Sequence, residues 1–158
     1  MSNKKKLLRI IPMILVMVVI FYFSTMEGDD SAETSGFFLD IAMKFTEEFT
    51  HHGLSAAALA TMHIIIRKIA HFTEYLVLGL SIMFAFYDYF KGKKLSLLPI
   101  QAIATLYATT DEIHQYFVPG RYGTWFDVMI DSCGAFTGIL IYFFIHKKRN
   151  ERDEHETL

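Results

Sequence analysis

Long apolar segments are the feature that most constrains the fold of this chain. Residues 10–23 read IIPMILVMVVIFYF without a charge, and three later segments are apolar over most of their length. A helix needs about 20 apolar residues to cross a bilayer, and lipid tolerates only helices and closed barrels. The sequence therefore predicts an all-α, polytopic membrane protein. Its four transmembrane helices are expected at about residues 7–24, 69–90, 95–117 and 125–146.

Composition agrees with a membrane protein and excludes several other classes. The chain has 158 residues and is 53% hydrophobic, whereas soluble domains contain roughly 45–50% apolar residues. Its formal net charge of −2 gives no basic surface for nucleic acid, so no nucleic-acid partner is expected. The single cysteine, Cys133, excludes an intramolecular disulfide and a cysteine-based zinc site.

The distribution of lysine and arginine predicts the orientation of the helices. Basic residues are concentrated in residues 4–9, 91–94 and 147–152. With four spans these stretches share one side, which the positive-inside rule assigns to the cytoplasm. Residues 147–158 are then a cytoplasmic tail, and residues 27–62 form an external segment. A cleaved signal peptide is the competing interpretation of the first apolar segment, but no small-x-small cleavage site follows it.

The external segment has a pattern of its own. Phe37, Phe38, Ile41, Phe45 and Phe49 recur at helical spacing within TSGFFLDIAMKFTEEF. We predict an additional amphipathic helix there, which lies on the membrane surface or covers the helix bundle.

Polar residues interrupt the last three apolar segments near one end of each. Since successive spans alternate in direction, all three polar sets are expected in the outer third of the bilayer, beside Arg121 of the last external loop. Spacings of three and four residues place each set on one helix face. The candidate cluster consists of Arg67, Lys68, His71, Glu74, Asp111, Glu112, His114, Gln115, Arg121, Asp127 and Asp131.

This cluster has more acids than fixed cations. Five carboxylates face two arginines and one lysine, which leaves a surplus of two acids. A charged side chain at the bilayer centre costs about 2.5–3.5 kcal/mol. Protonated histidines, a divalent cation, a cationic substrate or carboxyl protonation would each balance the surplus. We expect His71 and His114 to be hydrogen-bonded to acids of the cluster.

The residue types suggest two kinds of role. The candidate catalytic acid/base residues are Glu74, His71, Asp111, Asp127 and Asp131. The candidate binding residues are Arg67, Lys68, Glu112, His114, Gln115 and Arg121, whose arginines suit an anionic headgroup. Arg121 stands on a turn that has no evident structural need for arginine. No metal and no other cofactor is predicted; the alternative is a divalent metal bound by His71, Asp111 and His114.

The last apolar segment also carries a packing signal. Gly134 and Gly138 form the small-xxx-small pattern GAFTG, on the same helical stripe as Asp127 and Asp131. Such a pattern permits close helix approach. The acidic face of this segment is therefore expected to pack against another helix.

Together these residues resemble the VanZ-like family, named for an accessory protein of teicoplanin resistance. The similarity lies in RKIAHFTEYLVLGL, in TDEIHQYFVPGRYGTWFDVMIDSCGAFTG and in the Ser24 end of the first apolar segment. The resemblance covers roughly residues 10–145. It implies a multi-pass protein of the bacterial cell membrane, associated with lowered susceptibility to lipid-tailed glycopeptide antibiotics. It implies no particular reaction, since none is established for the family.

The leading functional hypothesis is a site at the outer leaflet that binds or modifies a cell-envelope ligand. Its partner would be a membrane lipid or a lipid-linked cell-wall precursor, recognised through negative charge. Two alternatives are an ion or proton relay and a structural or assembly protein without catalysis. The residues alone favour neither an enzyme nor a binding protein, and they indicate no oligomeric state.

The lysine distribution generates a prediction of topology. Both termini and Lys93 should lie in the cytoplasm, whereas Gly28–Met62 and Pro119–Gly123 should lie outside, because the basic loops are retained on the inner side. Reporter fusions at each region check this. A reporter at Lys93 that is active only outside the cell would contradict the predicted convergence of the polar residues.

Overall fold

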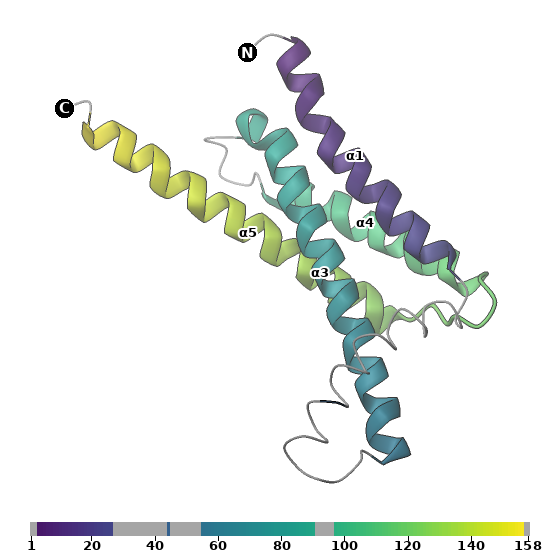
Figure 1. Ribbon diagram of the computed structural model, residues 1–158. Helices are drawn as coiled ribbons and strands as arrows, with labels where there is room; N and C mark the ends of the chain where they lie inside the picture. Colours follow the sequence, from purple (N-terminus) through teal and green to yellow (C-terminus); the bar gives the residue numbers. More distant parts are fainter. Residues whose placement is uncertain (1–2, 27–43, 45–54, 91–96, 157–158) are drawn as a thin grey trace.

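A computed structural model describes residues 3–26, 44, 55–90 and 97–156 (Figure 1). This part of the chain contains helices and no strand, so the predicted all-α class is confirmed for it. The helices are α1 (Asn3–Thr25), α3 (Ala56–Phe90), α4 (Leu97–Tyr116) and α5 (Trp125–Glu156). Most of the predicted external segment, including its phenylalanine pattern, lies outside the described residues.

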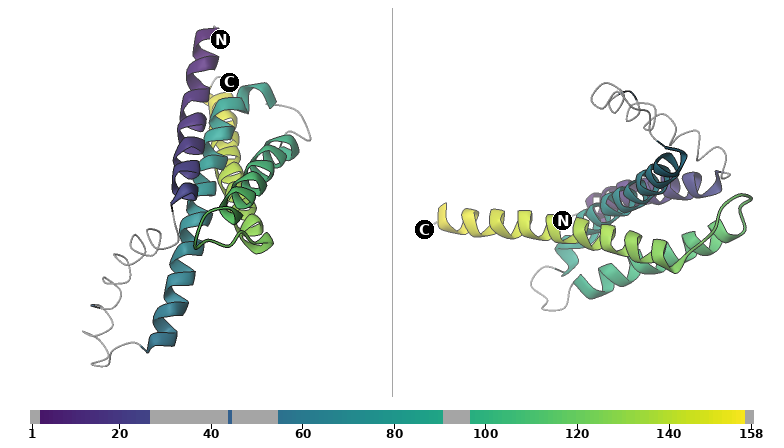
Figure 2. Two further views of the ribbon diagram at one scale, coloured as in Figure 1. Left: turned by 90° about the vertical axis from the view of Figure 1, so that its right-hand side faces the viewer. Right: turned by 90° about the horizontal axis from the view of Figure 1, so that it is seen from below.

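The four helices run alternately up and down. Helices α1 and α5 therefore bring the two chain ends to the same end of the molecule (Figure 1). Helix α3 is central: it packs most extensively against α5 and also contacts α1 and α4. Figure 2 shows the N-terminal part of α3 extending beyond the other helices.

Helix α3 begins well before the predicted span. It starts at Ala56 rather than near residue 69 and contains 35 residues, which corresponds to about 52 Å of helix. Ser55 precedes it as the N-cap, with its hydroxyl oxygen 3.3 Å from the amide nitrogen of Ala58. The alanine-rich start AAALA favours helix, so the helix extends past the apolar stretch that defines the span.

Glycines bring α3 and α5 into close contact. A Cβ atom added at Gly138 would lie 2.1 Å from the backbone oxygen of Leu76, and one at Gly134 would lie 2.3 Å from that of Phe72. On the facing helix, a Cβ at Gly79 would lie 2.1 Å from the oxygen of Ala135. The predicted small-residue packing face of α5 is therefore confirmed.

Most of the outer surface of the bundle is apolar, while a small core lies between the helices. The core contains Tyr75, Leu78, Ile82, Ile100 and Ile139, and large apolar side chains are exposed on every helix. Exposed apolar surface of this extent is typical of helices that face lipid.

Three of the described helices are long and apolar enough to cross a membrane, namely those spanning Leu7–Thr25, Ala56–Tyr89 and Trp125–Lys147. Helix α4 is not among them. Its last turns carry Asp111, Glu112, His114 and Gln115, which reduce its mean hydropathy. The fourth crossing therefore stays a prediction.

The glycine contacts generate a prediction of stability. Gly138→Ala should destabilise the protein by about 1–3 kcal/mol, because the added methyl group overlaps backbone that cannot shift easily. Thermal unfolding in detergent measures the effect. Ala102→Val, which adds bulk at an exposed position of α4, is the control. Equal unfolding midpoints for both variants would show that the close approach is not needed.

Candidate functional site

A short loop places the end of α4 beside the start of α5. The amide of Phe117 donates to the carbonyl of His114 over 2.9 Å, which closes the last turn of α4. Gly120 then adopts a φ of 73°, a left-handed conformation that glycine accepts without strain. Gly123 packs so closely on the backbone of Glu112 that a Cβ there would lie 2.2 Å from the carbonyl oxygen.

Polar caps fix this loop at both ends. Glu112 Oε2 accepts a hydrogen bond of 2.9 Å from the amide of Thr124. The hydroxyl of Thr124 in turn accepts one of 3.1 Å from the amide of Asp127, so that Thr124 is the N-cap of α5. Glu112 and Asp127 are thereby positioned by local structure and lie 4% exposed each.

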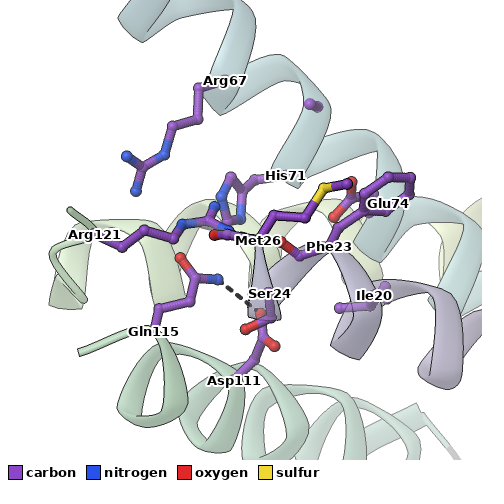
Figure 3. A pocket seen from close by; sticks show the side chains of 11 residues that line it. Ile20, Phe23, Ser24, Met26, Arg67, His71, Glu74, Asp111, Gln115 and Arg121 are labelled. Carbon is purple, nitrogen blue, oxygen red and sulfur yellow. Dashed lines mark hydrogen bonds between the residues drawn. The ribbon is translucent and has the colours of Figure 1, made fainter. Parts of the chain in front are cut away.

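The polar sets of α3 and α4 lie together at one end of the bundle, where a pocket of about 140 Å³ opens between the helices (Figure 3). The acids of α5 face α3 beside it. It is lined by Ile20, Phe23, Ser24, Met26, Arg67, Ala70, His71, Glu74, Asp111, Gln115 and Arg121. Of the predicted residues, Lys68, Glu112, His114, Asp127 and Asp131 lie outside its lining. Helical spacing thus brings the polar sets together, while the functional roles of these residues stay predictions.

Two cations of α3 neutralise the first acid of α5. Lys68 Nζ lies 2.6 Å from Asp127 Oδ1, and Arg67 Nη2 lies 3.8 Å from Asp127 Oδ2. The Asp127 side chain is 6% exposed, whereas those of Lys68 and Arg67 are 33% exposed. Lys68 also lies over the ring of Phe126, 4.7 Å from its centroid. Asp127 is therefore a paired acid, and Arg67 keeps part of its surface free.

His71 faces the second acid of α5. Its Nδ1 lies 3.4 Å from Asp131 Oδ1, which is an ion pair when the imidazole is protonated. Asp131 is completely buried. The expected partnership of His71 with an acid thus involves Asp131 across the α3–α5 interface.

The second histidine has a different partner. His114 Nδ1 lies 3.2 Å from the hydroxyl oxygen of Ser24, and its ring packs beside that of Phe21. The expectation that His114 is hydrogen-bonded to an acid is wrong. The C-terminal end of α1 lies beside this part of α4, and its serine satisfies the imidazole.

Ser24 is a pocket residue that helical spacing does not predict. It is 2% exposed and lines the pocket, where it lies beside Asp111 (Figure 3); its hydroxyl also faces His114. Asp111 also accepts a hydrogen bond of 3.0 Å from Gln115. The sequence signal for Ser24 is its inclusion in the resemblance to the VanZ-like family, because an uncharged apolar run precedes it and no polar residue lies one helical turn before it.

Arg121 has a structural role that the turn alone does not reveal. Its Nη1 donates to the carbonyl of Phe23 over 2.7 Å and to that of Met26 over 3.5 Å. It therefore caps the C-terminal end of α1, where unpaired carbonyls favour a cation. The interpretation that the turn has no need for arginine is wrong. Burial lowers the pKa of the Arg121 guanidinium, which nevertheless stays charged, and its buried Nε has no hydrogen-bond partner.

Exposed aromatic residues mark the same end of the bundle. Tyr22, Tyr116, Tyr122 and Trp125 are all exposed and belong to the ends of α1, α4 and α5 or to the loop. Tyrosine and tryptophan are enriched where a membrane meets water. Asp131 follows Trp125 by six residues, or about 9 Å of helix, so this buried acid lies less than two turns from the aromatic end of α5.

Comparison of the sequence with models of known protein families identifies a family to which the chain belongs. The family model described as VanZ/LLP1 matches residues 9–146. A search of curated proteins and a search of solved structures each found no significant match.

The ion pair between α3 and α5 generates a prediction. In a double-mutant cycle, Lys68→Met and Asp127→Asn should show a coupling energy of about 1.5 kcal/mol, at the low end for hydrogen bonds to charged groups. The low value follows from the one-third exposure of Lys68. Unfolding of the two single variants and the double variant measures it. Additive effects would mean that the pair contributes nothing to the α3–α5 contact.

Proposed function

The chain belongs to the VanZ/LLP1 family of membrane proteins, and from that premise we propose that its pocket binds an anionic headgroup at the outer leaflet. The ligand class is a membrane lipid or a lipid-linked cell-wall precursor, both of which carry phosphate. Binding would lower susceptibility to glycopeptides such as teicoplanin by holding or altering the envelope molecule that the antibiotic engages.

One observation carries this proposal: two arginines from separate segments line the same pocket. Arg67 reaches it from α3 with a third of its side chain exposed, and Arg121 reaches it from the loop (Figure 3). Guanidinium groups match phosphate oxygens in a fork geometry. Like charges held together in a partly desolvated pocket favour an anionic ligand between them.

The mixed apolar and polar lining of the pocket suits an amphipathic ligand. Apolar Ile20, Phe23 and Met26 form one side of it, while His71, Glu74 and Asp111 contribute polar groups. A headgroup near the arginines would leave an acyl or polyprenyl chain beside the exposed apolar face of α1. The carboxylates and the imidazole would accept hydrogen bonds from hydroxyl or amine groups of the same headgroup.

A second candidate function is turnover of the bound ligand. The Ser24 hydroxyl lies 3.2 Å from an imidazole nitrogen of His114 and lines the pocket. A hydroxyl beside a histidine is the arrangement of an activated nucleophile. Product analysis of a bound polyprenyl diphosphate separates the two candidates, since Ser24→Ala would abolish turnover while leaving binding in place.

A relay across the membrane has less support. The helices contain no Asp, Glu, Lys, Arg or His over three long stretches. These are residues 75–87 of α3, 97–110 of α4 and 132–145 of α5. Asp88 of α3 pairs with Arg9 of α1 at the end of the bundle that lies away from the pocket. A chain of titratable groups in pumps and transporters connects both sides, whereas these helices carry none between their two ends.

Lipid binding tests the proposal. Arg67→Gln should weaken binding of phosphatidylglycerol and of undecaprenyl diphosphate to the purified protein by about tenfold or more, the loss expected for a charge-assisted hydrogen bond. Native mass spectrometry in detergent measures it, with phosphatidylcholine as the zwitterionic comparison. Arg9→Gln removes an arginine near the opposite end and serves as the matched control. Equal losses for both variants would mean that only overall charge matters.

The role of the pocket carboxylate is tested in cells. The wild type should reduce the teicoplanin susceptibility of a sensitive host, and Glu74→Gln should abolish this reduction. Membrane insertion should be retained, because neutral residues insert more easily than charged ones. Susceptibility assays with membrane fractions probed for the protein measure both. Asp88→Asn is the control at the opposite end of α3. A wild-type phenotype in Glu74→Gln would remove this residue from the site.

A further inference from the structure

Three helices bring a compact set of metal-ligating side chains together behind the pocket. His71 of α3, Glu112 of α4 and Asp131 of α5 each offer a ligand atom, and these atoms lie within 4.8 Å of one another. The three residues are 6%, 4% and 0% exposed. Within the described part of the chain, this is the group whose geometry allows one ion to be shared.

Two buried oxygens of this set have no hydrogen-bond partner. They are Oδ2 of Asp131 and Oε1 of Glu112, while Oδ1 of Asp131 faces Nδ1 of His71 over 3.4 Å. Buried polar atoms are normally satisfied, and an unsatisfied one costs the free energy of its desolvation. Two unpartnered carboxylate oxygens within one group of ligand atoms therefore point to a bound species.

The fixed cations nearby face other groups. Lys68 and Arg67 are directed at Asp127, and Arg121 donates to α1 carbonyls. A proton on His71 Nδ1 does not replace them, because it faces Asp131 Oδ1 and leaves Asp131 Oδ2 and Glu112 Oε1 without a partner. The negative charge of Asp131 and Glu112 thus has no matching fixed cation in direct contact among the described residues.

We propose that His71, Glu112 and Asp131 bind one divalent transition-metal ion, of the zinc or manganese class. Two carboxylates and a neutral imidazole carry a charge that such an ion balances. The 3.4 Å between His71 Nδ1 and Asp131 Oδ1 is about the separation of two ligands on one tetrahedral zinc, whose metal–ligand distances are about 2.0–2.2 Å. An imidazole beside carboxylates favours these ions over magnesium or calcium, which prefer oxygen alone.

This ligand set differs from the one that sequence suggested. Of His71, Asp111 and His114, the new set keeps His71, while Asp111 interacts with Gln115 and His114 with Ser24. Because His71 also lines the pocket, the ion would lie next to it. Three protein ligands leave a further position for water or a ligand oxygen.

Metal analysis of the full-length protein tests the site. After stripping with chelator and reloading with zinc or manganese, the wild type should retain about one ion per chain, as measured by inductively coupled plasma mass spectrometry. Asp131→Asn and Glu112→Gln should each weaken the affinity at least about tenfold, since even groups behind the ligands cost about 10–100-fold. Asp88→Asn, which removes a distant acid, should bind like the wild type.

Two further measurements keep the outcomes distinct. X-ray absorption of the zinc-loaded wild type should show one imidazole with oxygen ligands, a readout that needs no variant to fold. Arg67→Gln should retain the metal, so loss of lipid binding alone would affect the proposed function and not this site. Substoichiometric metal in the wild type, or undiminished affinity in both ligand variants, would mean that only protons or water occupy the cluster and would overturn the proposal.

Discussion

The close approach of α3 and α5 is the constraint on which the rest of the structure depends. Gly79, Gly134 and Gly138 leave no room for a side chain between the two backbones. This contact places Asp127 against Lys68 and Asp131 against His71, away from lipid. Carboxylates in a membrane-spanning helix are costly unless protein groups surround them, so the close approach that the glycines allow also surrounds these acids with protein.

Much of this arrangement follows from the sequence. Helical spacing and the alternation of the helices predict the gathering of Arg67, His71, Glu74, Asp111 and Asp131, and GAFTG predicts the packing face. The contacts of Ser24 and Arg121 do not follow from spacing, because they depend on where the end of α1 meets α4 and the loop. Hydropathy alone also does not give the start of α3, since it marks the apolar part of a helix and not its full length.

Two chemically different regions lie side by side at this end of the bundle. One is the pocket, where Arg67 and Arg121 meet apolar side chains of α1 and which suits an amphipathic anion. The other is the buried set of His71, Glu112 and Asp131, whose unpartnered atoms suit a cation. His71 belongs to both, so an ion bound by this set would lie where it could attract the same phosphate group that we propose for the arginines.

Photo-crosslinking tests most directly whether the pocket is a headgroup site. A phosphatidylglycerol analogue with a photoreactive headgroup, activated in nanodiscs, should label Phe23–Met26 and residues 67–74, and excess undecaprenyl diphosphate should suppress this labelling. The lipid-facing residues Leu15 and Phe144, which are exposed on α1 and α5, should show little labelling. Equal labelling of all these positions, unaffected by the competitor, would contradict a headgroup site in the pocket.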